Sequence, residues 1–272
     1  MVFYKGNIAS RLDALREELN IRNLSGFFLP LTDEHQSEYV APYAGRLAYM
    51  TGFLGSAGSA LIMKDKAAIF VDGRYKIQVV DEVDATFFDI CHQAETLLEE
   101  WLDKNTVDKM VFGYDPSLHN IGWVKKITAI LENRGAYLEA QATNVVDVIW
   151  TDQPGEPDSP IYLHPLEFSG KSSSDKRRKL AEIIEEKGAD GTVFSALDSI
   201  AWLFNIRSND VLHTPVSLAY AILNANGSAI LFINDCKITD ELEDHLGDDV
   251  LIFPKRDFFG ALETLGKSGA VL

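Results

Sequence analysis

The sequence predicts an α/β protein built from two tandem domains, each a mixed β-sheet flanked by helices. Short apolar runs typical of strands alternate with longer amphipathic segments typical of helices along the whole chain. A segment rich in proline and glycine near the middle separates two regions that show the same order of patterns. The length of 272 residues is ample for two domains of ordinary size.

The first half opens with an amphipathic helix and contains one internal hairpin. Apolar residues at helical spacing predict a helix that Asn7 or Ser10 caps and that ends near Asn23. Two apolar runs joined by a short polar turn predict an antiparallel hairpin of strands 59–63 and 67–71. The other expected elements are, in order, a strand over 26–31, a turn or short helix over 35–40 halted by Pro42, a helix beginning near Arg74 with Ile77, Val80 and Val83 on one side, a strand over 85–91, a helix over 95–102 with Leu97, Leu98 and Trp101 on its core side, a strand over 109–113, a helix from Ser117 to Gly135, and a strand over 136–140.

The domain boundary is expected in residues 144–160. Three prolines and a glycine fall between positions 154 and 160, and such punctuation between two patterned regions marks a linker. We therefore expect domains over residues 1–158 and 159–272.

The second half repeats the plan of the first. Trp202 lies 153 residues after Tyr49 in a similar pattern, and Phe232 lies 162 residues after Phe70. Similar offsets indicate a duplicated domain with a loop inserted around residues 209–215. The expected elements are a helix over 174–187, a strand over 192–195, an apolar run ending at 223, a turn over 224–227, a strand over 229–233, a helix over 240–246, a strand over 250–253 and a helix over 258–265.

Composition excludes several classes of function. The formal net charge of −16 disfavours nucleic acid and anionic membranes as partners, because both would be repelled. Two cysteines, one in each half, suggest no disulfide framework. The N-terminus has no apolar signal region and no run approaches the length of a membrane span, so the cytoplasm is the default location.

The sequence offers no catalytic or metal centre. The six histidines are scattered, without the spacings of zinc sites, and no G-x-S-x-G elbow exposes a serine. The glycine-rich run from Gly52 to Gly58 is not a phosphate cradle, because a strand follows it and no basic residue is placed to help. We expect it to form tight turns.

Arg74 is the strongest candidate for a functional side chain. Asp72-Gly73 ends the second hairpin strand, and Asp72 can cap the next helix, so Arg74 stands at a corner where side chains are displayed. From the residues alone, two interpretations stay open: Arg74 forms a local ion pair with Asp72 or Glu82, or it contacts a ligand.

Three ordered motifs resemble a known family. G-F-x-G-S-A-G-x-A from Gly52 and D-G-R-Y-x-x-Q from Asp72 resemble the N-terminal domain of the creatinase, prolidase and aminopeptidase P family. D-x-H-Q-S-E-Y from Asp33 narrows the resemblance to the long, three-domain aminopeptidase P. In the second half, residues 205–216 are similar to the family segments N-x-R-G-S-D-V and N-P-V, with Ser-Asn in place of Gly-Ser and Thr in place of Asn. Gln153 stands where the family usually has an arginine.

This resemblance implies a role for the chain within a larger enzyme. Members of the family hydrolyse the bond before a penultimate proline with two divalent metal ions, typically manganese, held by a third domain. Gly269-Ala-Val-Leu272 looks like the start of a strand, so we expect the chain to be a fragment that lacks this catalytic domain. Its expected partners are that domain, a peptide with penultimate proline and a second copy in a homodimer.

The resemblance also assigns residues. It directs Arg74 toward the substrate channel, where a planar, always-charged donor suits peptide carbonyls or a carboxylate. Further candidate substrate contacts are His35, Arg46, Tyr75 and His213. The alternative to substrate contact is a structural role, in which Asp33, His35, Glu38 and Arg46 cap and pair groups around the loop that precedes the hairpin. The segment around His213 is expected to make an interdomain contact first and a substrate contact second.

The resulting hypothesis is a non-catalytic pair of domains that caps the active-site cleft, limits substrate size and assists assembly. Two alternatives stay open. The first is that the chain is a stand-alone binding or oligomerisation module. The second is that it is the N-terminal region of a prolidase or creatinase relative.

Overall fold

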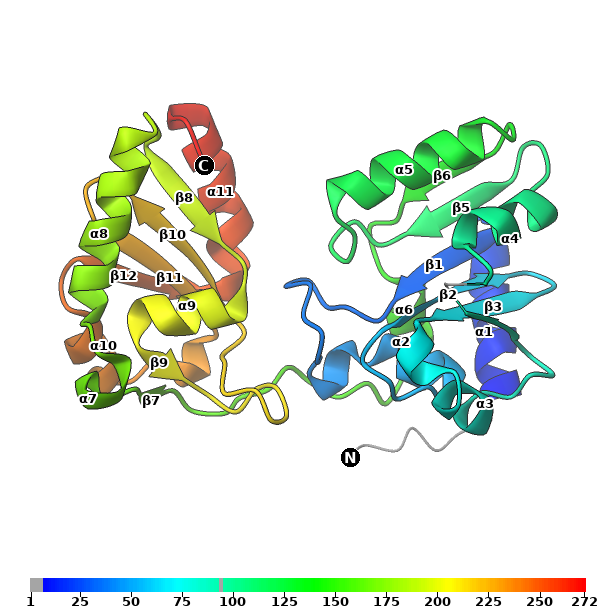
Figure 1. Cartoon of the computed structure of the whole chain (residues 1–272), viewed down its shortest axis with the longest axis horizontal. Coiled ribbons are helices and arrows are strands. Elements are labelled where there is room, and N and C mark those ends of the chain that lie inside the picture. The colour runs from blue at the N-terminus through cyan, green and yellow to red at the C-terminus, as the bar shows by residue number, and fades with distance from the viewer. Residues whose placement is uncertain (1–6, 93–94) are drawn as a thin grey trace. The chain divides into compact units, whose positions relative to one another are not determined.

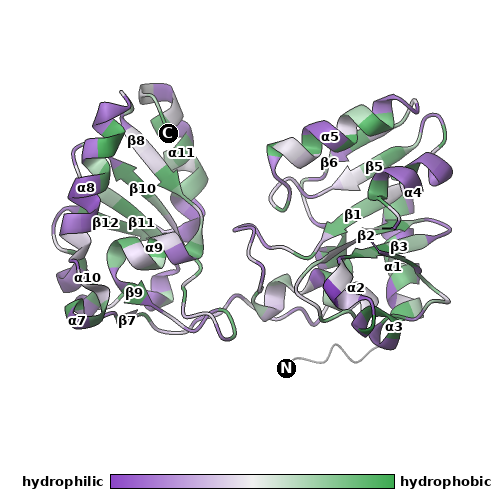
Figure 2. Cartoon of the chain, in the orientation of Figure 1, coloured by the Kyte–Doolittle hydropathy of each residue, from purple (hydrophilic) through white to green (hydrophobic). Residues whose placement is uncertain are grey.

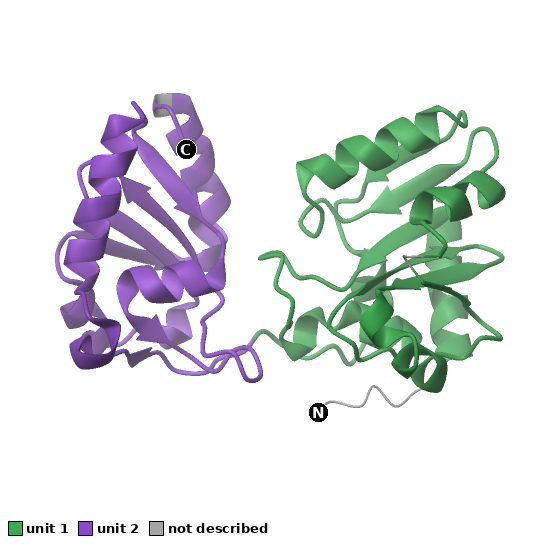
Figure 3. Ribbon diagram, viewed as in Figure 1, with its two compact units in different colours: residues 1–156 green, residues 157–272 purple. Residues whose placement is uncertain are grey.

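The computed structural model describes residues 7–92 and 95–272 of the chain. The described residues form two compact units, with the division between Glu156 and Pro157 (Figure 3). Each unit is a mixed β-sheet with helices on both faces, so the predicted fold class is confirmed (Figure 1). The strands of both sheets are largely hydrophobic, whereas the helices mix polar and apolar residues (Figure 2). No helix in the described part of the chain is long and apolar enough to cross a membrane.

The first unit holds a six-stranded sheet in the order β4-β3-β2-β1-β5-β6. Strand β2 runs antiparallel to β1 and β3, and the other neighbouring strands are parallel. Its elements are α1 (Ile8–Ile21), β1 (Gly26–Pro30), the 3-10 helix η1 (Pro42–Ala44), α2 (Arg46–Thr51), β2 (Gly58–Met63), β3 (Ala67–Val71), the 3-10 helix η2 (Gly73–Tyr75), α3 (Gln78–Glu82), β4 (Asp89–His92), α4 (Leu98–Asn105), β5 (Val111–Tyr114), α5 (Ile121–Glu132), β6 (Tyr137–Ala140) and α6 (Val145–Ile149).

Helices cover both faces of this sheet. Helices α1, α2, α3 and α6 pack on one face, in a cluster that includes the fully buried leucines of α1. Helices α4 and α5 pack on the other face, around Phe28, Phe70 and Phe112. The Asn7 side chain accepts a hydrogen bond from the Ser10 backbone N–H at 3.4 Å, so of the two predicted caps for α1 it is Asn7 that acts.

The helix expected to begin near Arg74 begins later in the structure, because Asp72 caps a short turn instead. Asp72 accepts from the Arg74 backbone N–H, which forms the tight turn η2, and α3 begins only at Gln78. A 3-10 turn rotates the following residues relative to an α-helix, so Ile77 and Val80 are exposed, 80% and 62%, while Val79 is buried. The expected grouping of Ile77, Val80 and Val83 is therefore wrong for the first two.

Three further boundaries shift for related reasons. Leu97 is the extended N-cap of α4 and is half-exposed, so its predicted core position is wrong and Leu102 is buried instead. Helix α5 starts after Asn120, whose side chain accepts from the Trp123 N–H at 2.9 Å, and not at Ser117. Strand β4 starts at Asp89, because a turn precedes it. Helix α2 is not among the elements that the sequence predicts.

The second unit has a four-stranded sheet in the order β12-β11-β10-β8. Helices α8, α9 and α10 cover one face, and α11 covers the other (Figure 1). Its elements are β7 (Tyr162–Leu163), α7 (Leu166–Ser169), α8 (Ser173–Glu186), β8 (Gly191–Phe194), α9 (Leu197–Phe204), β9 (Ile206–Arg207), β10 (Tyr220–Asn224), β11 (Ala229–Ile233), the 3-10 helix η3 (Asp235–Lys237), α10 (Asp240–Leu246), β12 (Val250–Pro254), the 3-10 helix η4 (Lys255–Asp257) and α11 (Phe258–Ser268).

The second unit is a copy of the first, as the sequence predicts. Strands β8, β10, β11 and β12 pair with the same directions as β1, β2, β3 and β4. Helix α2 ends at a left-handed Gly52 and α9 ends at a left-handed Asn205, 153 residues later. Strands β3 and β11 are 162 residues apart, so nine more residues separate α9 from β11 than separate α2 from β3, and most of them lie before β10.

A buried ion pair holds this inserted loop. The Lys237 ammonium contacts Asp210, and both side chains are fully buried. Asp210 Oδ2 also accepts from the Leu218 N–H at 2.8 Å and the Ser217 hydroxyl at 3.2 Å, while Oδ1 accepts from the Ser208 hydroxyl at 3.1 Å. Lys237 occupies, in η3, the position that Tyr75 occupies in η2, so the copies differ at this corner.

Candidate functional site

Arg74 lies at the corner between β3 and α3, with its side chain 61% exposed. Its Nε and Nη2 atoms donate to Asp72 Oδ2 at 2.9 and 2.6 Å, a two-point contact that fixes the guanidinium plane. The same contact lowers the pKa of Asp72, so the pair stays charged across the neutral range. Of the two local partners considered for Arg74, Asp72 is the actual one.

Three segments converge around this guanidinium. Arg74 Nη1 lies 3.7 Å from Glu38 Oε1, and the guanidinium carbon lies 5.3 Å from the centre of the Tyr75 ring. The Ser56 hydroxyl donates to Glu38 at 2.8 Å and lies 2.8 Å from the Tyr75 hydroxyl. We call these five residues, Glu38, Ser56, Asp72, Arg74 and Tyr75, the Arg74 cluster. It joins all three motifs of the first half.

The glycine-rich loop is shaped to bring Ser56 into the Arg74 cluster. Gly52 adopts a φ of +81°, a left-handed conformation that favours glycine. A Cβ at Gly55 would lie 2.3 Å from the Phe53 ring and 2.7 Å from the Tyr75 ring, so only glycine fits between them. Glu82 accepts from the Leu54 N–H at 2.8 Å and fixes the loop to α3. The loop therefore forms a tight turn with close packing, as its sequence suggests.

His35 is a buried part of the loop over residues 31–41. Asp33 Oδ1 accepts from the backbone N–H groups of His35 and Ser37, both at 3.0 Å, and so holds the turn. The imidazole lies 4.0 Å from Glu34 Oε1, which also accepts from the Tyr43 hydroxyl at 2.8 Å. Burial raises the pKa of Tyr43, so this hydroxyl keeps its proton. His35 therefore supports the loop that carries Glu38.

Arg46 is buried and paired within the first unit. Its Nε and Nη2 atoms donate to the two carboxylate oxygens of Asp147 at 2.6 and 2.9 Å. The Gln153 amide donates to the same carboxylate at 2.9 Å and to the Tyr43 carbonyl at 2.8 Å. A neutral amide thus supplies donors at the position where the family resemblance leads one to expect an arginine. The contacts of Arg46 fix α2 to α6 within the domain.

His213 belongs to the second unit and lies in its inserted loop. The residue is exposed and its φ of 61° is in the left-handed region, at a turn closed by a bridge between Val211 and Thr214. Of the five candidate substrate contacts, the structure places Arg74 and Tyr75 in one cluster, while His35 and Arg46 make separate, mostly internal contacts.

Both halves of the chain match a known domain. Residues 11–148 match the Creatinase/Prolidase N-terminal domain, and residues 152–272 match a second domain of the same description. The chain belongs to the creatinase/prolidase N-terminal domain family. It carries two such domains in tandem, which agrees with the duplication seen in the sheets.

Curated relatives share this tandem pair. The chain is 36% identical over 265 residues to a "Probable Xaa-Pro aminopeptidase P" of Coccidioides posadasii (strain C735), covering 96% of this chain and 41% of the relative. A protein with the same name from Aspergillus fumigatus is also 36% identical, covering 96% of this chain and 40% of the relative. The chain thus spans about two fifths of the length of these relatives.

A solved structure has the same fold. The crystal structure of the X-prolyl aminopeptidase from Caenorhabditis elegans, described as a cytosolic enzyme with a di-nuclear active site, superposes with a TM-score of 0.91 at 26% identity. The match covers 97% of this chain and 45% of that one. These similarities establish the homology to Xaa-Pro aminopeptidases that the three motifs suggest.

The creatinase/prolidase N-terminal domains described here do not fit a two-metal centre. Within residues 7–92 and 95–272, no three His, Cys, Asp or Glu side chains are grouped so that they could hold a metal ion. Sequence reasoning did not single out Ser56, which links Glu38 to Tyr75. The small residues of the glycine-rich loop indicate a tight backbone turn, and nothing in their pattern indicates a contact with Glu38.

Proposed function

We propose that this chain is the non-catalytic N-terminal region of a cytosolic, metal-dependent Xaa-Pro aminopeptidase. Such an enzyme removes the N-terminal residue from peptides whose second residue is proline. The observation that carries the proposal is the 36% identity to Xaa-Pro aminopeptidases P over 96% of the chain. The two units would cap the active-site cleft, limit the size of the substrate and assist assembly as a homodimer.

The metal chemistry is assigned to the part of the relatives that this chain does not span. Two divalent ions, manganese in this proposal, would supply Lewis-acid activation of water and carbonyl there. The described residues hold no donor set for them. The contribution of this chain is therefore binding and orientation of the peptide.

Arg74 is the residue that we propose contacts the substrate. Its guanidinium is exposed, held rigid by Asp72 and always charged, so it presents donors with little loss of side-chain entropy. Its charge is already balanced by Asp72 and by Glu38 at 3.7 Å. A neutral peptide carbonyl is therefore a better partner than a C-terminal carboxylate, which would have to displace Glu38.

The test compares this chain with the full-length product of the same gene on Arg-Pro-Pro in the presence of manganese. We expect activity only in the longer protein. Arg74→Ala in that protein should lower kcat/KM about 10- to 100-fold, the value of one charge-assisted hydrogen bond. Arg256→Ala is the matched control, because Arg256 is also an exposed arginine paired with an aspartate, in the second unit.

Each other outcome favours a different function. Activity of this chain alone would contradict the proposal and require a catalytic centre among these residues. Cleavage of the dipeptide Arg-Pro, without cleavage of Arg-Pro-Pro, would indicate a prolidase relative. If neither protein cleaves a proline peptide, the stand-alone binding module becomes the better explanation. Equal kcat/KM for Arg74→Ala and wild type would show that Arg74 does not contact the substrate.

A further inference from the structure

A cavity of about 550 Å³ opens on the face of the first sheet that α4 and α5 cover. This volume is in the range of pockets that bind small molecules. Its floor is formed largely by strands β1, β2 and β3, and its walls by the N-terminal parts of α4 and α5. Aromatic rings of Phe28, Phe70 and Trp123 line it together with several polar side chains.

The cavity lies at the topological switch point of the sheet. Strands β1 and β5 are parallel neighbours, and the chain leaving β1 reaches α2 on one face while the chain leaving β5 reaches α5 on the other. The crevice at the carboxyl ends of such strands is the usual ligand site of open α/β sheets. Thr32, after β1, and Leu118, after β5, both line the cavity.

The walls are held in place without a ligand. Gln36 donates to the Leu118 carbonyl at 3.0 Å and has a φ of 58°, a conformation that non-glycine residues rarely adopt. An ion pair between Glu99 and Lys126 ties α4 to α5 across the cavity. The ring of His119 packs on Trp123 with centroids 3.9 Å apart. The cavity is therefore preformed, which lowers the entropic cost of binding.

The polar groups of the cavity favour a neutral ligand that donates a hydrogen bond. The Nδ1 atom of His119 lies 2.9 Å from the Asp115 carbonyl oxygen, which only accepts, so Nδ1 carries the proton. Nε2 is then the acceptor of the ring, and burial lowers the pKa of His119, which favours this neutral form. The Lys126 charge is balanced by Glu99, and the chain has a net charge of −16, so an anion is disfavoured.

We propose that this cavity binds an uncharged, planar heteroaromatic ring that donates an N–H hydrogen bond to His119. The ring lies against the aromatic side chains of Phe28, Phe70 and Trp123, where offset or edge-on contacts are favourable. This site is distinct from the Arg74 cluster, and it stands whether or not the proposed peptidase function holds.

The probe for the test is benzimidazole, an uncharged bicyclic ring with one N–H, titrated into the whole chain. Binding is followed by calorimetry and by the indole N–H resonance of Trp123. We expect a dissociation constant of about 1 mM or below, as is typical of a fragment of this size. The matched ligand 1-methylbenzimidazole keeps the ring but lacks the N–H, and it should bind at least fivefold more weakly.

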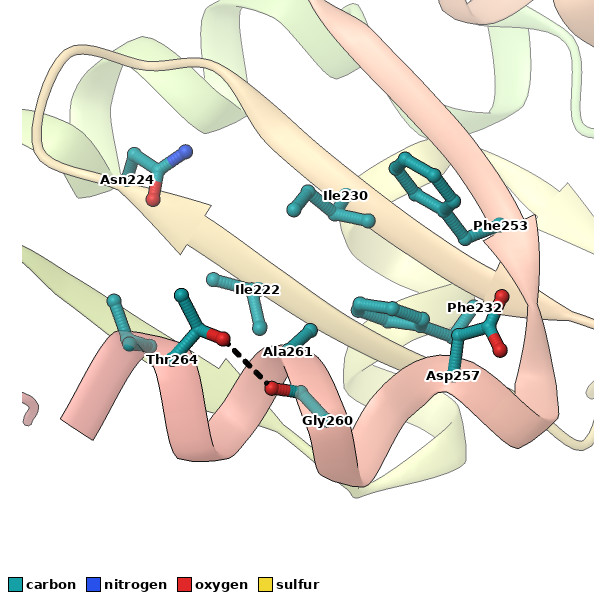
Figure 4. Close-up of a pocket in the computed structure, with 10 residues that line it drawn as sticks. Ile222, Asn224, Ile230, Phe232, Phe253, Asp257, Gly260, Ala261 and Thr264 are labelled. Atoms are coloured by element: carbon teal, nitrogen blue, oxygen red, sulfur yellow. Dashed lines mark hydrogen bonds between the residues drawn. The ribbon is translucent and has the colours of Figure 1, made fainter. Parts of the chain in front are cut away.

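Variants separate this cavity from the rest of the molecule. Ser59→Leu fills the floor and should abolish binding, and His119→Phe keeps the ring contact with Trp123 but should weaken binding at least fivefold. The control is Thr264→Leu in a groove of the second unit, where the Thr264 hydroxyl donates to the Gly260 carbonyl (Figure 4). That variant should bind as wild type does.

Three results would overturn the proposal. The first is no binding at millimolar benzimidazole, with the Trp123 resonance unchanged. The second is equal binding of the two ligands, which would mean that the N–H is not recognised. The third is binding that survives both Ser59→Leu and His119→Phe, which would place the ligand elsewhere.

Discussion

Replacing Asp210 with alanine tests the buried ion pair that holds the inserted loop of the second unit. The substitution leaves the Lys237 ammonium buried without its charged partner and removes the acceptor for the Leu218 N–H. Breaking a buried pair in this way costs about 3–5 kcal/mol. A unit of this size has a free energy of unfolding of about 6–17 kcal/mol, so much of its stability is at stake.

The assay must report on one unit at a time. Trp202 is the one tryptophan in the sequence of the second unit, and the other three of the chain's four tryptophans lie in the first. Fluorine-labelled tryptophan therefore gives separate urea unfolding curves for the two units by NMR. With a slope of about 1.5 kcal/mol per molar urea, Asp210→Ala should lower the Trp202 midpoint by about 2 M or more. The other three signals should not move.

A double variant separates charge from packing. Asp210→Asn combined with Lys237→Met keeps an acceptor for the loop but removes both charges, so it should cost only about 1–2 kcal/mol. The control Asp235→Ala breaks an exposed pair and should cost less than about 0.5 kcal/mol. A shift below about 0.3 M for Asp210→Ala, or a double variant as unstable as the single one, would refute the reasoning.

Three further predictions use the same chain. Arg46→Ala removes the two-point contact with α6 and should lower the free energy of unfolding of the first unit by about 2–3 kcal/mol, measured by urea unfolding at the Trp150 fluorine signal. Gly55→Ala should cost about 1–3 kcal/mol in thermal unfolding because its Cβ meets two rings, whereas Gly73→Ala, with open space around it, should change little. Cys91 is buried and Cys236 is exposed, so a thiol reagent at pH 8 should modify one cysteine in the native chain and two in urea. Burial also raises the pKa of the Cys91 thiol to about 11. The free energy of unfolding should therefore fall as the pH rises from about 9 to 11, because the thiol ionises in the unfolded chain and not in the native one.

The parts of the fold that sequence predicted are those with strong local patterns. The hairpin of β2 and β3 has two apolar runs and a polar turn, and α1 has a regular leucine stripe. The duplication was visible because Trp202 and Phe232 keep their places relative to Tyr49 and Phe70. These signals are local in the chain, so one sequence is enough to read them.

The errors come from competition between capping groups. The side chains of Asp72 and Asn120 decide where η2 and α5 begin, although residues nearby could have served equally well by composition, and α4 begins after Leu97 without a side-chain cap. Helix α2 has only six residues, and it forms because its buried side chains pack on the sheet. Such contacts are not local, so the pattern of the segment does not reveal them.

The candidate site was predicted in part. Motif spacing singled out Arg74 and Glu38, but their meeting through Ser56 depends on three segments folding together. His35 and Arg46 are buried and make internal contacts. Polar residues are usually exposed, so their sequence alone does not predict this burial. Their assignment as substrate contacts, like that of His213, stays a prediction.

The corner between the third strand and the following helix occurs twice in this chain, and its two copies have diverged in opposite directions. One copy reads Asp-Gly-Arg-Tyr and holds a cation out toward solvent. The other reads Asn-Asp-Cys-Lys and keeps its cation inside, neutralised by the inserted loop. One corner thus displays its charge to solvent, whereas its twin uses a buried charge to hold the inserted loop. Fold stability therefore constrains the lysine of the second corner, whereas the exposed arginine of the first corner is available for the substrate contact that we propose.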